Sequence, residues 1–342
     1  MSTGDKGGIP LPSPPTLPDH FEKVSVLGAG CFGYVLLCQK RSTKQFVAIK
    51  RTLKTDSTAI REYNDLRALV HPRIVRAIDL IHSSDHNYMV LEHCESGDLK
   101  AFRKRFEKQR VQIPEAFLWH AFLQMAEGVA WLQSKGYVHR DLKPHNILLT
   151  QNGRKWNDGY PNLKLADFGL CCTLKESLAE NKPRGTWIYK PKDCGCGTFE
   201  ADVWALGAII HYLAMGVSPT PAINMKAFEY DKKTKRTQRA LDLAWYSNVE
   251  RYMLPINQVE VIVASNKWDD PVAYSDDLAC WMEMAMEEDP VERIAADELV
   301  EGLKEDIDGM EMVPLPRFAV LKSAGDRFVK LDGAWYEMGG AR

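Results

Sequence analysis

Residues 139–146 read His-Arg-Asp-Leu-Lys-Pro-His-Asn, a mostly polar run that lies between two apolar segments. The segment before it, FLWHAFLQMAEGVAWLQSKG, is apolar on almost every side of a helix, as a buried helix is, and Gly136 is expected to end it. The apolar residues 147–149 follow, and Asp167-Phe-Gly169 begins twenty-one residues after Asn146. At roughly 5% usage per residue type, seven specified residues match by chance at about one position in 10⁹. The run is therefore a motif with a chemical role.

The first part of the chain has the pattern of a β-sheet. Between Phe21 and about Glu92, short β-branched runs alternate with turn residues, which predicts strands. One helix is expected to interrupt them, with Ser57 as its N-cap. The helical apolar stripe consists of Ile60, Tyr63, Leu66 and Leu69.

Past Gly97 the pattern becomes helical. The segment ADVWALGAIIHYLAMG is expected to end at Gly216, Ser275 can cap the helix that follows it, and a last helix begins near Asp297. A strand-rich first part followed by a helix-rich second part predicts an α+β protein with two lobes.

Composition and charge narrow the class of protein. Apolar residues make up 45% of the 342 residues and charged residues 26%, as in a globular protein, and the formal net charge is −2. We expect neither a nucleic-acid nor a membrane partner, because the chain has no basic field and no run of about eighteen apolar residues. Eight scattered cysteines and the lack of a secretory-signal pattern favour the cytoplasm or nucleus. The cysteine pairs at 171–172 and 194–196 lack the spacing of a zinc site.

A glycine-rich segment, Gly28-Ala29-Gly30-Cys-Phe-Gly33, lies between two expected strands. Glycines let the backbone approach phosphate oxygens, and backbone amides can donate to them. The same spacing also fits a dinucleotide-binding fold or a cluster of turn glycines. A dinucleotide site requires a helix directly after the loop, whereas GYVLLCQK has the pattern of a strand. This favours a β-hairpin flap over a nucleotide.

Lys50 ends the next expected strand, Val47-Ala-Ile-Lys50. A lysine next to a phosphate loop can neutralise nucleotide phosphates, and it then needs a carboxylate to hold it. Glu62 lies four and seven residues before Leu66 and Leu69 on the expected helix, so its side chain faces inward. An unpaired charge is costly there, and pairing with Lys50 is the expected solution.

Taken in order, the glycine-rich loop, VAIK, HRDLKPHN, DFG and DVWALG resemble the signature motifs of the eukaryotic protein kinase superfamily, serine/threonine branch, over roughly residues 20–308. The resemblance implies a bilobal protein-kinase fold with a β-rich N-lobe and a helical C-lobe, and ATP and Mg²⁺ as cofactors. We expect a flexible Pro-rich tail at 1–18, a kinase domain at 19–308 and a C-terminal extension at 309–342. Within the domain, the N-lobe is expected at about 19–94 and the C-lobe at about 95–308.

The resemblance also implies roles for single residues. Asp141 matches the catalytic aspartate that accepts the proton of the substrate hydroxyl, and Lys143 matches the lysine that steadies the transferred phosphoryl group. Lys50, held by Glu62, matches the lysine on the α- and β-phosphates. The implied Mg²⁺ ligands are Asn146 and Asp167.

The implied ATP site draws on both parts of the chain. Its residues are Gly28, Ala29, Gly30, Gly33, Val35, Ala48, Lys50, Glu92, Cys94 and Leu148. Among these, Val35, Ala48 and Leu148 would sandwich the adenine, and Glu92 and Cys94 would offer backbone hydrogen bonds beyond the gatekeeper Leu91. The implied regulatory spine contains Leu66, His139 and Phe168.

Lys143 and Thr186 match residues of the serine/threonine branch, so the expected partner is a protein substrate with Ser or Thr. Arg140 matches an arginine that collects an activation-loop phosphate, which makes Thr173 and Ser177 candidate sites for an activating kinase or for autophosphorylation. Constitutive activity is the alternative.

Some segments depart from the family pattern. Asp193 stands where the family has a glutamate, and Arg293 is its expected partner. Residues 151–162 are expected to extend a surface hairpin, and the basic residues 232–239 belong to a solvated insertion or to a nuclear-import or docking patch. Residues 318–338 alternate like a hairpin with a turn at Gly325-Asp326, which packs on the helical lobe or binds a partner.

Two other functions fit the same fold. A pseudokinase scaffold that binds nucleotide without transferring phosphate would be expected to lack Lys50, Asp141 or Asp167, and none is missing. A kinase for small molecules would differ after the DFG motif, where the DVWALG segment and Arg293 favour the protein-kinase branch.

Overall fold

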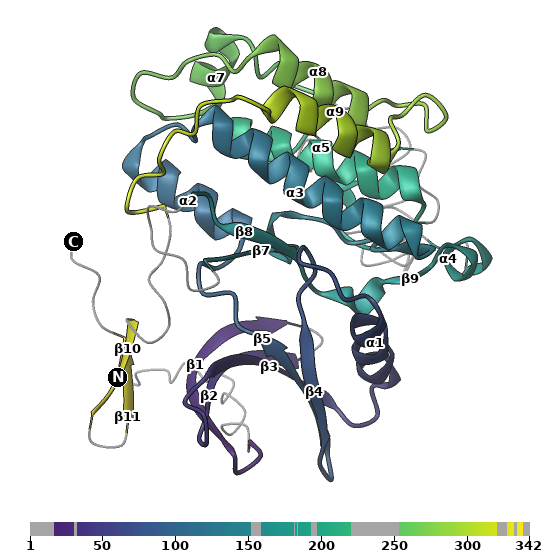
Figure 1. The fold of residues 1–342 in the computed structure, drawn as a ribbon, viewed down its shortest axis with the longest axis vertical. Coiled ribbons are helices and arrows are strands. Elements are labelled where there is room, and N and C mark those ends of the chain that lie inside the picture. Colours follow the sequence, from purple (N-terminus) through teal and green to yellow (C-terminus); the bar gives the residue numbers. More distant parts are fainter. Residues whose placement is uncertain are drawn as a thin grey trace, which may run out of the picture.

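A computed structural model describes residues 17–30, 33–151, 159–180, 182, 184–192, 197–219, 253–319, 327–331 and 334–337. One lobe is a five-stranded antiparallel sheet in the order β1-β2-β3-β5-β4 (Figure 1). Its strands are β1 (Phe21–Gly30), β2 (Gly33–Lys40), β3 (Phe46–Leu53), β4 (Ala77–His82) and β5 (His86–Glu92). The helix α1 (Ser57–Ala68) connects β3 to β4 and lies beside the sheet. The predicted β-rich lobe is therefore confirmed.

The other lobe is helical, as the sequence predicts. Its helices are α2 (Leu99–Gln109), α3 (Glu115–Ser134), α4 (Leu174–Glu180), α5 (Phe199–Met215), α7 (Val259–Ser265), α8 (Asp276–Ala285) and α9 (Ala296–Ile307). Two short strand pairs lie between the lobes, β6 (Tyr137–Val138) with β9 (Cys172–Thr173) and β7 (Ile147–Thr150) with β8 (Asn162–Leu165) (Figure 1). These pairs border the motifs, so the strands fix the loops that carry the polar residues.

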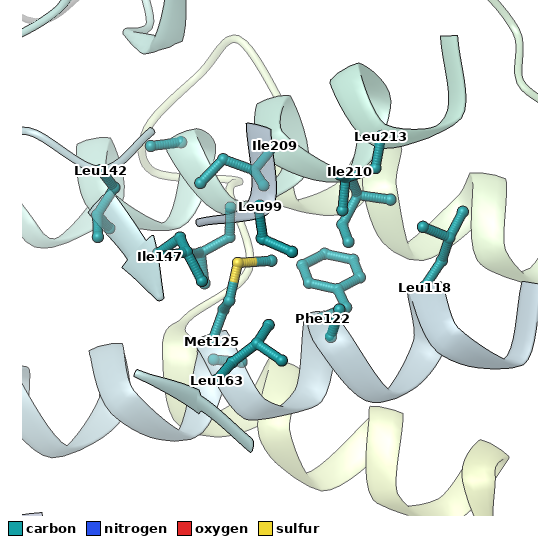
Figure 2. Packing of buried hydrophobic residues seen from close by; sticks show 14 of the residues in the cluster. Leu99, Leu118, Phe122, Met125, Leu142, Ile147, Leu163, Ile209, Ile210 and Leu213 are labelled. Atoms are coloured by element: carbon teal, nitrogen blue, oxygen red, sulfur yellow. The ribbon is translucent and has the colours of Figure 1, made fainter. Parts of the chain in front are cut away.

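The core of the helical lobe is built around α3. Figure 2 shows Phe122 and Met125 of α3 pointing toward Leu99 of α2 and Ile210 of α5. All four side chains are fully buried, in agreement with the apolar pattern on nearly every side of α3. The core extends to Ile147, directly after the 139–146 motif, so the motif borders closely packed side chains.

Most helix ends agree with the prediction. Gly216 follows α5 in the left-handed conformation, and the Ser275 side chain accepts a hydrogen bond from the Leu278 N–H. The start of α1 was predicted wrongly, because Asp56 is the N-cap instead of Ser57. The apolar stripe of α1 is also shifted, since Ile60 is 39% exposed whereas Ala59 is buried. Glu62 occupies the inward face in its place.

A C-terminal hairpin packs on the N-lobe sheet. Its strands are β10 (Phe328–Leu331) and β11 (Ala334–Glu337), which pair antiparallel with Leu331 opposite Ala334. The predicted turn at Gly325-Asp326 lies outside the described residues. The buried Phe328 packs with Leu37 of β2, and the Trp335 ring meets Phe46 of β3 at 6.0 Å. The hairpin itself contacts the sheet, whereas Phe318 and Ala319, at the start of the same segment, pack on the helical lobe beside Phe106 of α2.

Several expectations lie outside the described residues. They concern residues 1–16 of the tail, the segments at 152–158 and 232–239, and Asp193, Cys194 and Cys196. Among the helices that the structure describes, none is both long enough and apolar enough to span a bilayer.

The hairpin contact predicts a stability effect. Replacing Phe328 with Ala should lower the free energy of unfolding by about 2 kcal/mol, because a buried aromatic ring is lost from a small cluster. The shift in the midpoint of urea-induced unfolding, relative to the wild type, measures this loss of stability. Val291 is 85% exposed, and Val291→Ala should leave the midpoint unchanged. A wild-type midpoint for Phe328→Ala would contradict the docked position of the hairpin.

Candidate active site

The catalytic loop, residues 139–146, is anchored to the helical lobe by the buried carboxylate of Asp202 in α5. Asp202 accepts hydrogen bonds from the backbone N–H groups of His139 (2.6 Å) and Arg140 (3.0 Å). Arg140 has a φ of 68°, a left-handed conformation that a non-glycine residue rarely adopts. The two hydrogen bonds to Asp202 stabilise this conformation and thereby set the position of Asp141, the next residue.

Asp141 lies at the centre of a compact polar cluster. Its Oδ2 is 2.7 Å from the Lys143 Nζ, and its Oδ1 accepts a hydrogen bond of 2.7 Å from the Thr186 hydroxyl. The same Lys143 ammonium also donates to the Thr186 hydroxyl at 3.0 Å. The structure therefore brings together the two residues that the sequence predicts beside Asp141. A carboxylate with an adjacent cation can accept a proton from an incoming hydroxyl while negative charge is balanced nearby.

Asn146 and Asp167 lie near each other because Asn146 directly precedes β7, Asp167 follows β8, and these two strands are paired. The backbone N–H of Ala166 donates to the Asn146 carbonyl at 2.8 Å. The Asn146 side-chain Nδ2 donates to the backbone carbonyl of Asp141 (2.8 Å), which leaves its amide oxygen for a ligand. The Asp167 side chain is 42% exposed, so part of its carboxylate faces the solvent. Oxygen atoms of this kind suit Mg²⁺, which also takes oxygens from phosphates and water.

Lys50 joins three parts of the molecule. Its Nζ lies 2.8 Å from Glu62 of α1 and 2.9 Å from the Oδ1 of Asp167. Burial alone would lower the pKa of Lys50, but the two carboxylates outweigh burial and raise it. Burial likewise acts to raise the pKa of Asp167, and the Lys50 charge outweighs it and lowers that pKa. The ion pair of Lys50 and Glu62 that the sequence predicts is present.

Cross-strand pairing places the predicted adenine residues on the cleft face of the sheet. Val35 pairs with Lys50 and Leu37 pairs with Ala48, and paired residues in an antiparallel sheet share a face. Because Lys50 points into the cleft, Val35 and Ala48 do so as well. Leu148 lies half-buried on β7 of the other lobe.

The glycine-rich loop is a hairpin between β1 and β2, as the sequence predicts, with Gly30 paired to Gly33. Gly33 has a φ of 123°, and a Cβ there would collide with the backbone carbonyl of Arg51. Only glycine fits this position. Gly28 and Ala29 pair with Val35 and Tyr34, so they belong to the ladder of β1 and β2.

The last residue of β5, Glu92, forms an ion pair that the sequence reasoning missed. Lys164 of β8 is buried and lies 2.8 Å from the Glu92 carboxylate. It ties the end of β5 to the strand that leads into Asp167. Beyond it, no hydrogen bond from the Cys94 N–H forms within the part of the chain that the structure describes. A ligand could use that donor.

Two of the spine residues implied by the resemblance are in contact. The His139 and Phe168 rings meet edge to face at 4.9 Å, and Leu66 is buried in the same large hydrophobic cluster as Phe168. Asp202 was missed as a positioning residue, although its place in DVWALG was a usable signal. Arg293 donates to the backbone carbonyls of Glu287, Glu200 and Glu288, while its expected partner Asp193 lies outside the described residues.

Both residues of the first cysteine pair, Cys171 and Cys172, are buried, and burial raises the pKa of both thiols. No group of three or more metal-binding acidic, His or Cys side chains occurs within the described ranges.

The Asp202 contacts predict a loss of stability. Asp202→Ala would leave two buried N–H groups without an acceptor and should lower the free energy of unfolding by about 3 kcal/mol. Asp202→Asn keeps one acceptor oxygen, so its free energy of unfolding should fall by less than that of Asp202→Ala. Urea unfolding followed by tryptophan fluorescence measures both variants. An Ala variant as stable as the wild type would contradict the role of Asp202.

Comparisons with known proteins agree with this geometry. The family model of the protein kinase domain matches residues 21–302. The serine/threonine-protein kinase ATG1a of Arabidopsis thaliana is 34% identical over 202 residues, which cover 56% of this chain and 31% of the relative. The serine/threonine protein kinase OSK3 of Oryza sativa subsp. indica is 34% identical over 204 residues, which cover 56% of this chain and 38% of the relative. The maternal embryonic leucine zipper kinase of Danio rerio is 31% identical over 232 residues, which cover 62% of this chain and 31% of the relative.

The matched part of the chain thus spans between 31% and 38% of the length of these relatives. The two relatives from plants carry the name of the serine/threonine branch. Because the family model covers most of the sequence, this chain belongs to the protein kinase family, whose members generally use ATP and Mg²⁺.

Proposed function

We propose that this chain is an active serine/threonine protein kinase that transfers the γ-phosphoryl group of ATP to Ser and Thr hydroxyls of proteins. The observation that carries the proposal is one cleft with two sets of charged groups. Lys50, Glu62 and Asp167 form an ion cluster on one side, and Asp141 with Lys143 forms a carboxylate–cation pair on the other. Phosphoryl transfer depends on positioning and on prepositioned charge, which these two sets supply.

Each residue has a definite part in the proposed reaction. Asp141 would orient the acceptor hydroxyl and take its proton, since a carboxylate within hydrogen-bond reach can do so. Lys143, 2.7 Å from Asp141, would meet the charge on the transferred group. The Thr186 hydroxyl holds both side chains in place.

The residues fit ATP and Mg²⁺. When bound, Mg-ATP supplies the phosphoryl group to be transferred and a divalent charge beside it. Asn146 and Asp167 would hold the metal through oxygen atoms, and Lys50 would bind the α- and β-phosphates while Glu62 orients it. The backbone of the loop at 28–33 would cover the phosphates.

The adenine would lie between the lobes. Val35 and Ala48 would cover one face of the ring and Leu148 the other, as apolar side chains do in nucleotide sites. The carbonyl of Glu92 and the N–H of Cys94 would hydrogen-bond its edge.

The preference for serine and threonine rests on Lys143 and Thr186. Their mutual contact with Asp141 supports it, because the acceptor hydroxyl must enter the same small cluster. We further propose that residues 19–308 form the kinase domain, between the tail at 1–18 and the extension at 309–342. The scattered cysteines support a cytoplasmic or nuclear location.

The first test is phosphoryl transfer itself. The full chain with Mg²⁺ and labelled ATP should label Ser and Thr positions of a peptide array, and Asp141→Asn should reduce the rate by about 10³-fold or more because the proton acceptor is lost. A folded wild type that binds ATP without transferring label would favour the pseudokinase alternative. Labelling of tyrosine alone would contradict the serine/threonine assignment.

The second test concerns the metal ligands. Mg²⁺ should raise the melting temperature of the wild type in the presence of ADP, and chelation by EDTA should remove the increase. Asp167→Asn should lose the Mg²⁺-dependent increase, because a carboxylate ligand is replaced by a neutral amide. The exposed Asp277 provides a matched control, and Asp277→Asn should respond as the wild type does. An unchanged response of Asp167→Asn would contradict its role.

A further inference from the structure

The side chain of Arg140 links the catalytic loop to the segment that follows the DFG motif. Arg140 is only 7% exposed, and its Nε donates to the backbone carbonyl of Leu170 at 2.6 Å. Its Nη1 lies 2.8 Å from the Oε2 of Glu180, the last residue of α4. A Cβ at Gly185 would collide with the Arg140 carbonyl, so the same segment also packs against the loop backbone. A buried guanidinium of this kind needs an anion, because an unpaired buried charge is costly.

Glu180 supplies that anion. Its Oε1 accepts hydrogen bonds from Arg184, and its Oε2 accepts one from Arg140. Hydrogen bonds from Arg184 and from Arg140 lower the pKa of Glu180 to about 2. The carboxylate is therefore ionised at every pH at which the protein would be assayed, and it bridges two guanidinium groups.

A second carboxylate of α4 ties the segment to the other lobe. Glu176 pairs with Arg61 of α1 at 2.8 Å, and it accepts hydrogen bonds from the backbone and side chain of Thr173. Glu62, the partner of Lys50, follows Arg61 directly. The three arginines and two glutamates line one cavity of about 420 Å³ between α1 and the segment. Each of these arginines already has a carboxylate partner.

The hydroxyl groups of the segment are also engaged. Between Phe168 and Lys192 the sequence contains four hydroxyl residues, namely Thr173, Ser177, Thr186 and Tyr189. Ser177 is fully buried and donates to the Gly197 carbonyl at 2.6 Å. Thr173 is bound to Glu176, Thr186 to Asp141, and Tyr189 is buried. The two hydroxyls predicted as phosphorylation sites therefore both have partners in this conformation.

We propose that Glu180 is a positioning residue that takes the place of an activation-segment phosphate, so that the kinase needs no phosphorylation of this segment. This inference rests on the proposed kinase function. A phosphate orders such a segment by offering negative charge to arginines. Glu180 offers a permanent negative charge to Arg140 and Arg184 and thereby holds the segment that carries Thr186 against the catalytic loop.

The test uses the full chain, freed of phosphate with lambda phosphatase and verified by intact mass. With Mg-ATP and dephosphorylated casein, the phosphate-free wild type should be as active as protein that has been preincubated with ATP. Glu180→Gln should lower kcat about tenfold or more while the KM for ATP stays unchanged, because Glu180 acts on the loop and not on the nucleotide. Glu180→Asp keeps the charge and should recover part of the rate. The exposed Glu301 provides a matched control, and Glu301→Gln should behave as the wild type does.

A second readout does not depend on activity. Hydrogen exchange of the backbone amides at 172–180 should be faster in Glu180→Gln than in the wild type and in Glu301→Gln. The proposal is overturned if Glu180→Gln matches the wild type in rate and exchange, or if the wild type gains activity only after phosphorylation of Thr173 or Ser177. If the wild type transfers no phosphate in any state, the proposed function fails, and the exchange of the segment still decides whether Glu180 holds it.

Discussion

The ion cluster of Lys50, Glu62 and Asp167 is the contact on which the arrangement of the cleft depends. A lysine at this depth requires carboxylates, and the two that it contacts come from α1 and from the DFG motif. The Lys50 ammonium therefore holds the sheet, α1 and the DFG segment in fixed positions relative to one another. The inward position of Glu62 also accounts for the exposed Ile60, because a helix face that presents a carboxylate to the cleft turns its neighbour toward solvent.

The catalytic loop is held both by the core of the helical lobe and by the segment after the DFG motif. Asp202 of α5 holds the backbone of His139 and Arg140 from the core, and Arg140 extends outward to Leu170 and Glu180. The loop is consequently coupled to both the interior of the helical lobe and the segment after the DFG motif. Arg61, which pairs with Glu176, extends the coupling to α1 and so to the Lys50 cluster. The two lobes share a chain of ion pairs in addition to the polypeptide connection.

The success of sequence reasoning varied with the range of the interaction. The ends of α5 and α8, the glycine hairpin and the pairing of Lys50 with Glu62 could be predicted, because each follows from local conformational preference or from the cost of an unpaired buried charge. The predictions that Ser57 caps α1 and that Ile60 belongs to its buried face were wrong. Helices that start one residue earlier or later, or are rotated slightly, satisfy the same local sequence pattern. The docking of the C-terminal hairpin was open for a different reason: alternation indicates a strand but not the surface that it meets.

The sequence by itself determined the two-lobed plan, the protein kinase family and the residues proposed to bear the chemistry, because these are encoded in runs of adjacent residues and in helical periodicity. Only the tertiary structure decided which charges meet across long separations, such as Lys164 with Glu92 and Arg140 with Glu180. It also decided that the hydroxyls of Thr173 and Ser177 are already hydrogen-bonded. The physical reason is that pairing of a charge or a hydroxyl depends on which segments the core brings within about 3 Å, and spacing along the chain does not contain that information.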